Sequence, residues 1–169
     1  FISVPIDQTR FPELIAAHGD YVLVWFDDVN ALYVNRRQHP AVAEAQGLPG
    51  VNPFELAGLT PGDLAPRVRN EPILPHLARL LAVDPGAQIT NHLAALAYAD
   101  EGAYDQMLPH AEAIIHSYPE APTGYRLKAQ AMAKLGLIQE ALASYRLAWA
   151  RTDGSDRREI GKAMGRLSL

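Results

Sequence analysis

Six histidines are the side chains of this sequence whose chemistry could hold a metal ion. They are His18, His39, His76, His92, His110 and His116. None belongs to a His-Glu-x-x-His pair, and no two are spaced by four residues on one helix face. Zinc sites need several such ligands close together. The sequence therefore predicts no metal site.

Two adjacent carboxylates, Asp27 and Asp28, could serve as a general acid and a general base. They fall in a polar stretch, 27–30, between two apolar runs, where a turn is expected. Neighbouring side chains in a turn point apart, which is a poor arrangement for an acid–base pair. We interpret both as acceptors for the backbone N–H groups of the turn.

No residues in the sequence form a nucleophile constellation. There is no cysteine, and the serines have no evident histidine and acid partners. Glycine-rich phosphate loops and Gly-x-Ser-x-Gly elbows are also missing from the sequence. Trp25, Phe26 and Tyr33 could form an aromatic platform, but alternation on strand faces favours a core role. We expect neither catalysis nor a cofactor in this chain.

The overall composition is that of a globular protein, with 49% hydrophobic and 20% charged residues. The formal net charge is −4 and no basic block occurs, which argues against nucleic acid as a partner. No apolar run approaches the roughly 18 residues of a membrane-spanning helix. The chain begins with Phe1 rather than Met, so we expect it to be a piece of a longer protein.

The amino-terminal residues 1–40 have the pattern of a small α/β unit. Residues 1–6 read as a strand, and 10–18 read as a helix with Phe11, Leu14 and Ile15 on one face. The β-branched and aromatic runs 21–26 and 31–34 predict a hairpin. Seven of the 13 prolines then fall between residues 40 and 75, so 41–69 is expected to be an irregular connector with short turns of helix.

Residues 70–169 change to a helical pattern that repeats after 34 residues. Gly102 and Gly136 are spaced by this period, and each is placed to end a helix in a left-handed conformation. Pro85 and Pro119 have the same spacing. Small residues, Ala95, Ala129 and Ala141, would let paired helices approach, while Tyr98, Met132 and Tyr145 would fill the space between pairs. We expect Pro109 to bend its helix, and Trp149 to pack under the last helix.

These positions resemble the signature of the tetratricopeptide repeat family. The matching residues are Ala95, Tyr98, Gly102, Tyr104, Ile114 and Pro119, then Tyr125, Ala129, Gly136, Ala141, Tyr145 and Ala148. Asn91 and Asp153 depart from the family pattern. The resemblance implies a mainly α fold in which antiparallel helix pairs form an α–α superhelix over 70–169. Residues 70–82 would be a half-repeat, and 155–167 a capping helix with Ile160, Met164 and Leu167 inward and its charged residues outward, among them Asp156, Arg157 and Arg166.

Ligands of this family contact the first helix of each pair, which makes this surface the candidate site. Carried over to this sequence, the candidate peptide-binding residues are His92, Leu96 and Asp100 in the first repeat, and Thr123, Arg126, Gln130 and Lys134 in the second. Arg126, Gln130 and Lys134 recur at four-residue spacing and so share one helix face. Such a row could hold an acidic segment or a peptide carboxylate. A merely solvated face is the alternative.

Residues 1–56 also resemble the soluble carboxy-terminal tail of bacterial polytopic membrane proteins of the glycosyltransferase type. The resemblance is in the order of strand, helix and the Gly-Asp-Tyr-Val-Leu-Val-Trp-Phe-Asp-Asp segment. Two functions follow as expectations. The first is a non-catalytic scaffold that binds a protein, a peptide or a second copy of itself. The second is an accessory domain of a membrane-embedded enzyme, on the extracytoplasmic side. Apolar segments upstream of Phe1 would favour the second.

Overall fold

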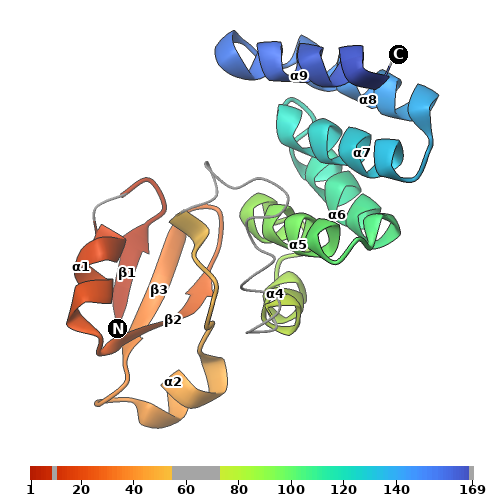
Figure 1. Ribbon diagram of the computed structural model, residues 1–169. Coiled ribbons are helices and arrows are strands. Elements are labelled where there is room, and N and C mark those ends of the chain that lie inside the picture. Colours follow the sequence, from red (N-terminus) through yellow and green to blue (C-terminus); the bar gives the residue numbers. More distant parts are fainter. Residues whose placement is uncertain (9–10, 55–72, 168–169) are drawn as a thin grey trace.

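Three short strands and a series of helices make up the described chain, which covers residues 1–8, 11–54 and 73–167 of the computed structural model. We call residues 1–54 the sheet unit and residues 73–167 the helical stack. The two units lie side by side, with the amino terminus in the first and the carboxy terminus at the far end of the second (Figure 1). The fold is mainly helical with one small antiparallel sheet.

The sheet has the strand order β1-β3-β2, with both pairings antiparallel. Its strands are β1 (Ile2–Pro5), β2 (Tyr21–Phe26) and β3 (Asn30–Asn35). The predicted strand and hairpin are thus confirmed. Asp27 behaves as expected in the hairpin turn, because its Oδ1 accepts hydrogen bonds from the N–H groups of Val29 at 2.8 Å and Asn30 at 2.7 Å. Phe26 and Tyr33 are buried, as the core interpretation predicts, whereas Trp25 is half-buried and packs against the core.

Two helices accompany the sheet, α1 (Phe11–His18) and α2 (Pro40–Gln46). The first confirms the predicted helix, and Gly19 follows it with φ of 62°. The predicted apolar face is wrong in one member, since Leu14 is 61% exposed while Ile15 is buried. The second is a short helix of the kind expected in the proline-rich connector, whose residues 55–69 lie outside the described part of the chain.

The helical stack is a succession of helices in which each packs against the next along the chain. Its helices are α4 (Leu74–Leu81), α5 (Gln88–Asp100), α6 (Tyr104–Ser117), α7 (Pro122–Lys134), α8 (Ile138–Ala150) and α9 (Gly154–Leu167). The small residues expected where helices approach, Ala95, Ala129 and Ala141, are fully buried. Pro109 lies inside α6, which continues through it.

The turns after α5 and α7 repeat one geometry 34 residues apart. Gly102 and Gly136 have φ of 76° and 80°, so both adopt the predicted left-handed conformation. In each turn the amide after the glycine bonds a carbonyl five residues back: Ala103 N to Tyr98 O at 2.9 Å, and Leu137 N to Met132 O at 2.9 Å. This pattern is the Schellman cap, which satisfies carbonyls that the helix end leaves open.

The Gly136→Ala substitution should isolate the conformational cost of this turn. No atom lies within 4 Å of a Cβ placed on Gly136, so only the positive φ opposes the side chain. We expect the free energy of unfolding in urea to fall by about 1 to 2 kcal/mol. Gly161→Ala is the control, because that glycine lies inside α9 with equally open surroundings and without a positive φ. Equal effects of the two substitutions would contradict the prediction.

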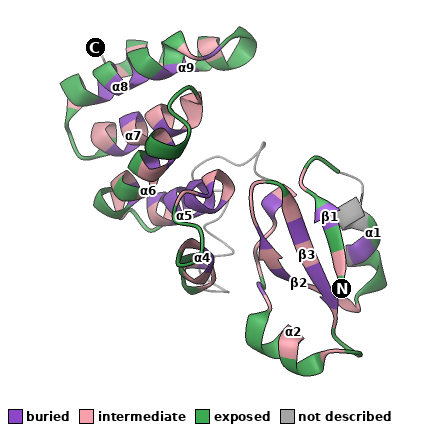
Figure 2. Ribbon diagram, turned by 180° about the vertical axis from the view of Figure 1, so that it is seen from behind, coloured by how far each residue is buried: buried purple, intermediate pink, exposed green. Residues whose placement is uncertain are grey.

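A cluster of buried apolar side chains extends from the sheet unit into the helical stack. It includes Phe26 of β2, Leu77 of α4, Leu93 of α5 and Ile114 of α6. Figure 2 shows the buried residues along β3 and α5 and the exposed ones on α2 and α9. Burial of such side chains stabilises the fold by roughly 1.5 to 3 kcal/mol each.

A smaller cluster joins α7, α8 and α9 around Ala129, Tyr145, Ala148 and Ile160, with Met164 and Leu167 packed against it. The inward face expected for the last helix is therefore confirmed. Trp149 differs from the expectation. It is 41% exposed, and the guanidinium of Arg157 lies over its ring at 3.6 Å.

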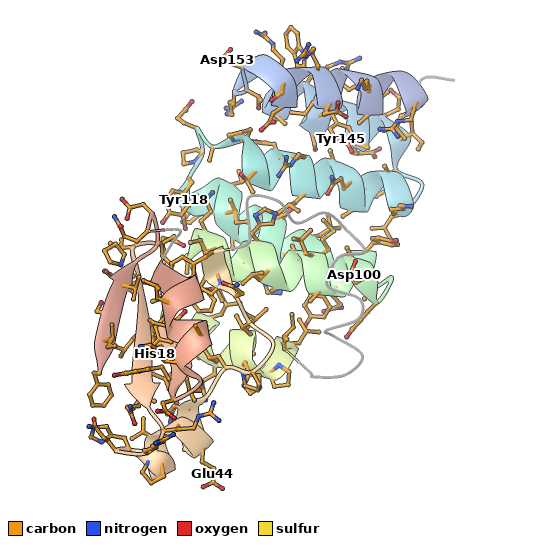
Figure 3. The ribbon with its side chains drawn as sticks, turned by 60° about the vertical axis from the view of Figure 1, so that its left-hand side comes forward. His18, Glu44, Asp100, Tyr118, Tyr145 and Asp153 are labelled. Carbon is orange, nitrogen blue, oxygen red and sulfur yellow. The ribbon has the colours of Figure 1, made fainter. Side chains whose placement is uncertain are left out.

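Two charged side chains cap helices across the junction of the two units. Asp28 of the sheet unit accepts hydrogen bonds from Gln88 N (2.7 Å) and Ile89 N (2.8 Å) at the start of α5, and from the hydroxyl of Tyr118 (2.7 Å). The interpretation of Asp28 as a turn acceptor is thus wrong. Figure 3 labels Tyr118 where the tip of the hairpin meets the helices.

Arg79 of α4 makes the converse contact with the sheet unit. It donates to the carbonyls of Ala45 at 3.1 Å and Gln46 at 2.7 Å, at the end of α2. A helix carries partial positive charge at its amino end and partial negative charge at its carboxyl end. The carboxylate of Asp28 thus faces the positive end of α5, and the guanidinium of Arg79 faces the negative end of α2. Both contacts therefore favour the docking of the sheet unit against the helical stack.

Candidate ligand-binding site

The residues predicted on α5 offer little surface to a ligand. Leu96 is 1% exposed and lies in the large core cluster, and His92 is 6% exposed. Asp100 is half-buried near the end of the helix and is labelled in Figure 3. His92 and Leu96 are therefore packed inside the protein, and only Asp100 of the three retains partial exposure.

The predicted row on α7 divides between two environments. Arg126 and Gln130 line one cavity. Lys134 is exposed, and its Nζ lies 5.9 Å from the ring centre of Tyr104 on α6. Thr123 is half-buried and is not part of the cavity lining. The structure thus brings together Arg126 and Gln130. His92 is close enough to Arg126 for the guanidinium charge to lower the pKa of the imidazole.

The cavity of Arg126 and Gln130 lies between α7, α8 and α9 and has a volume of about 560 Å³. We call it the α7–α9 cavity. The other residues that line it are Tyr145 from α8 and Asp156, Glu159, Ile160, Ala163 and Arg166 from α9. Tyr145 and Ile160 are buried members of the smaller core cluster. Figure 3 labels Tyr145, which lies between the ribbons of α7 and α9.

Charges of both signs line this cavity, and Asp156, like the two arginines, has no ion pair among the described residues. Glu159 accepts a hydrogen bond from Lys162 at 2.7 Å, and this contact lowers the pKa of its carboxyl group. Arg126 and Arg166 have no ion pair with any residue in the described ranges. The two guanidinium groups are therefore available to an anionic ligand, and the charge of Arg166 also contributes to the lowered pKa of Glu159.

The pKa values of Tyr145 and His92 both reflect burial and the charges of the site. Burial raises the pKa of Tyr145, while the nearby cations Arg166 and Arg126 act in the opposite direction. Burial lowers the pKa of His92 to about 4, and the charge of Arg126 adds to this effect. An anion bound beside Arg126 would offset that charge and raise the pKa of His92.

Six of the lining residues were not predicted as site residues, namely Tyr145, Asp156, Glu159, Ile160, Ala163 and Arg166. Asp156 and Arg166 were expected to point outward from α9. They are exposed, yet they line the cavity. Tyr145 was expected only as a spacer. One signal in the sequence could have found this wall. Asp156, Glu159 and Ala163 are spaced by three and four residues, so they share one face of the last helix.

No protein-family model matches the chain, and a comparison with curated proteins finds no significant match. Within the described ranges, no helix is long and apolar enough to cross a membrane. In the same ranges, no group of three or more His, Asp or Glu side chains is placed to hold a metal ion. The geometry of the site is therefore the basis for the functional argument.

Proposed function

We propose that this chain is a non-catalytic protein-interaction scaffold of the tetratricopeptide type, which holds an acidic segment of a partner protein in the α7–α9 cavity. The observation that carries the proposal is the pair Arg126 and Arg166 on the cavity wall, neither of which has an ion pair among the described residues. Guanidinium groups bind carboxylates through charge-assisted, often bidentate hydrogen bonds.

The repeated architecture supports the scaffold class. Equivalent Schellman turns recur after 34 residues, and fully buried alanines let the paired helices approach. In an array of this kind, neighbouring helix pairs bury a continuous core and leave a surface between first helices for ligands. Here α7 and α9 supply that surface, whereas α5 is packed into the core.

The chemistry of the cavity favours an extended acidic peptide over a compact anion. Gln130 offers both a donor and an acceptor to a peptide backbone, and Arg126 and Arg166 offer cations to carboxylate side chains. Tyr145 and Ile160 supply apolar surface at the base. A volume of about 560 Å³ is in the range of sites that bury several side-chain groups.

Peptide binding to variants of the full chain would test this function. We expect a short labelled Glu-rich peptide to bind with an affinity that falls as salt rises, and its Gln-substituted counterpart to bind more weakly. The double variant Arg126→Gln/Arg166→Gln should weaken the Glu-rich peptide by about tenfold, measured by fluorescence anisotropy.

Arg146→Gln/Arg158→Gln is the matched control, because Arg146 of α8 and Arg158 of α9 are exposed arginines that do not line the cavity. It removes two positive charges from the same region of the chain, as the double variant does. Equal binding by the control, the double variant and the unmodified chain would overturn the proposed site.

A further inference from the structure

A second cavity, of about 320 Å³, lies between α4, α5 and α6 and is separate from the α7–α9 cavity. Its walls are Leu74, Leu77 and Leu81 of α4, with the alanines Ala78, Ala82 and Ala94. Tyr98 of α5 and His110 of α6 complete the lining. Among the described residues, no Asp, Glu, Lys or Arg lines it, so the described part of its wall is apolar apart from two ring systems. We call it the α4–α6 cavity.

Hydrogen bonds behind the wall fix the protonation of the His110 ring. Asn91 donates from its Nδ2 to the carbonyl oxygens of Pro85 at 2.8 Å and Ala87 at 2.9 Å. This fixes the amide so that Oδ1 faces Nδ1 of His110 at 2.9 Å. An amide oxygen can only accept. Nδ1 of His110 therefore carries the proton.

This tautomer leaves Nε2 of His110 as a hydrogen-bond acceptor. Burial lowers the pKa of His110, so the ring is neutral at neutral pH. In a neutral imidazole with a proton on Nδ1, Nε2 has a free lone pair. No hydrogen bond joins Nε2 to any residue in the part of the chain that the structure describes. The ring of Tyr98 stacks on the imidazole at 5.5 Å between centres, with 20° between planes, and so fixes its orientation.

We propose that the α4–α6 cavity binds a small uncharged aromatic molecule that carries one hydrogen-bond donor, with Nε2 of His110 as its acceptor. The described walls are apolar and hold no counter-charge, so they disfavour ions, because a charge that enters would lose part of its hydration without compensation. A cavity of about 150 Å³ already accommodates benzene, so the larger volume here leaves room for a phenol- or indole-sized ligand. The exposed Ala78 and Ala82 place the opening of the cavity at α4.

Phenol and toluene are a matched pair of probes for this site, since they differ by a hydroxyl in place of a methyl group. Titrations of the full chain, followed by the amide shifts of residues around the cavity, should show saturable binding of both. In the His110→Phe variant, which keeps a ring beside Tyr98 but has no acceptor, the preference for phenol over toluene should fall by about tenfold. An unchanged preference would overturn the role of His110.

Two further measurements keep the test decisive if His110→Phe changes the packing. Ala78→Leu, at an exposed position on the cavity wall, should weaken both probes together, and equal binding by this variant would place the probes elsewhere. Long-range proton–nitrogen correlations of the unmodified chain should show His110 protonated on Nδ1 alone. A proton on Nε2, or no saturable binding of either probe, would overturn the proposal.

Discussion

Replacing Asp28 with alanine is expected to lower the free energy of unfolding by roughly 2 to 3 kcal/mol. The carboxylate accepts three hydrogen bonds, from the N–H groups of Gln88 and Ile89 and from the hydroxyl of Tyr118. The residue at the cap position of α5, Ala87, has no side chain that could replace it. Urea denaturation would measure the loss, and hydrogen exchange should show faster opening at Gln88 and Ile89.

Substitutions at Tyr118 and Asp27 distinguish the stability that comes from the α5 cap from the stability that comes from the hairpin turn. Tyr118→Phe removes one hydrogen bond and leaves the α5 cap in place, so its cost should be near 1 kcal/mol. The hydrogen bond to Asp28 is also the largest of the effects that raise the pKa of Tyr118 to about 12. Asp28→Ala should therefore lower that pKa. Asp27→Ala affects only the hairpin turn and should leave exchange at Gln88 unchanged. Equal exchange at Gln88 in the Asp28 and Asp27 variants would contradict the cap.

Local patterns in the sequence predict most of the secondary structure because each depends on nearby residues. The hairpin follows from β-branched runs on either side of a polar turn, and its Asp27 bonds the N–H groups two and three residues ahead. The turns after α5 and α7 follow from Gly102 and Gly136, whose positive φ is a property of the residue itself. The 34-residue period then predicts equivalent turns without any knowledge of long-range contacts.

The errors of the sequence reading come from contacts between residues far apart in the chain. Asp28 looked like a turn residue, but its partners are 60, 61 and 90 positions away. Leu14 has the spacing of a core residue, yet its side chain is 61% exposed. Local periodicity predicts which residues share a helix face, but not which other element packs on that face.

The candidate site likewise has one part that local spacing predicts and one part that depends on long-range packing. The spacing of Arg126 and Gln130 predicts that they share a face, and both line the α7–α9 cavity. The spacing of His92 and Leu96 predicts an equivalent face on α5, but this part of α5 belongs to the core. The opposite wall, with Arg166, depends on how α9 packs against α7 and α8, which no local signal specifies.

Acidification should destabilise the protein through His92, by roughly 3 kcal/mol between pH 6.5 and pH 4. Burial and the charge of Arg126 lower the pKa of His92 to about 4, from the 6.5 of a solvated imidazole. Between these values the unfolded chain binds a proton that the folded chain does not. Stability is therefore fully present above pH 6.5 and declines as the pH falls toward 4, because about 1.4 kcal/mol is lost for each pH unit.

The slope of stability against pH, measured by urea denaturation across this range, is the quantity that identifies His92. His92→Gln keeps a polar side chain that does not titrate, so the slope should become shallower even if the variant is less stable at neutral pH. Burial also lowers the pKa of His110, which should leave a smaller slope of the same sign in the variant. His116→Gln alters an exposed histidine of α6 and should retain the full slope. If His92→Gln instead retained it, the acid sensitivity would arise elsewhere.

A bound acidic peptide should also flatten the slope in the unmodified chain, because an anion beside Arg126 raises the pKa of His92.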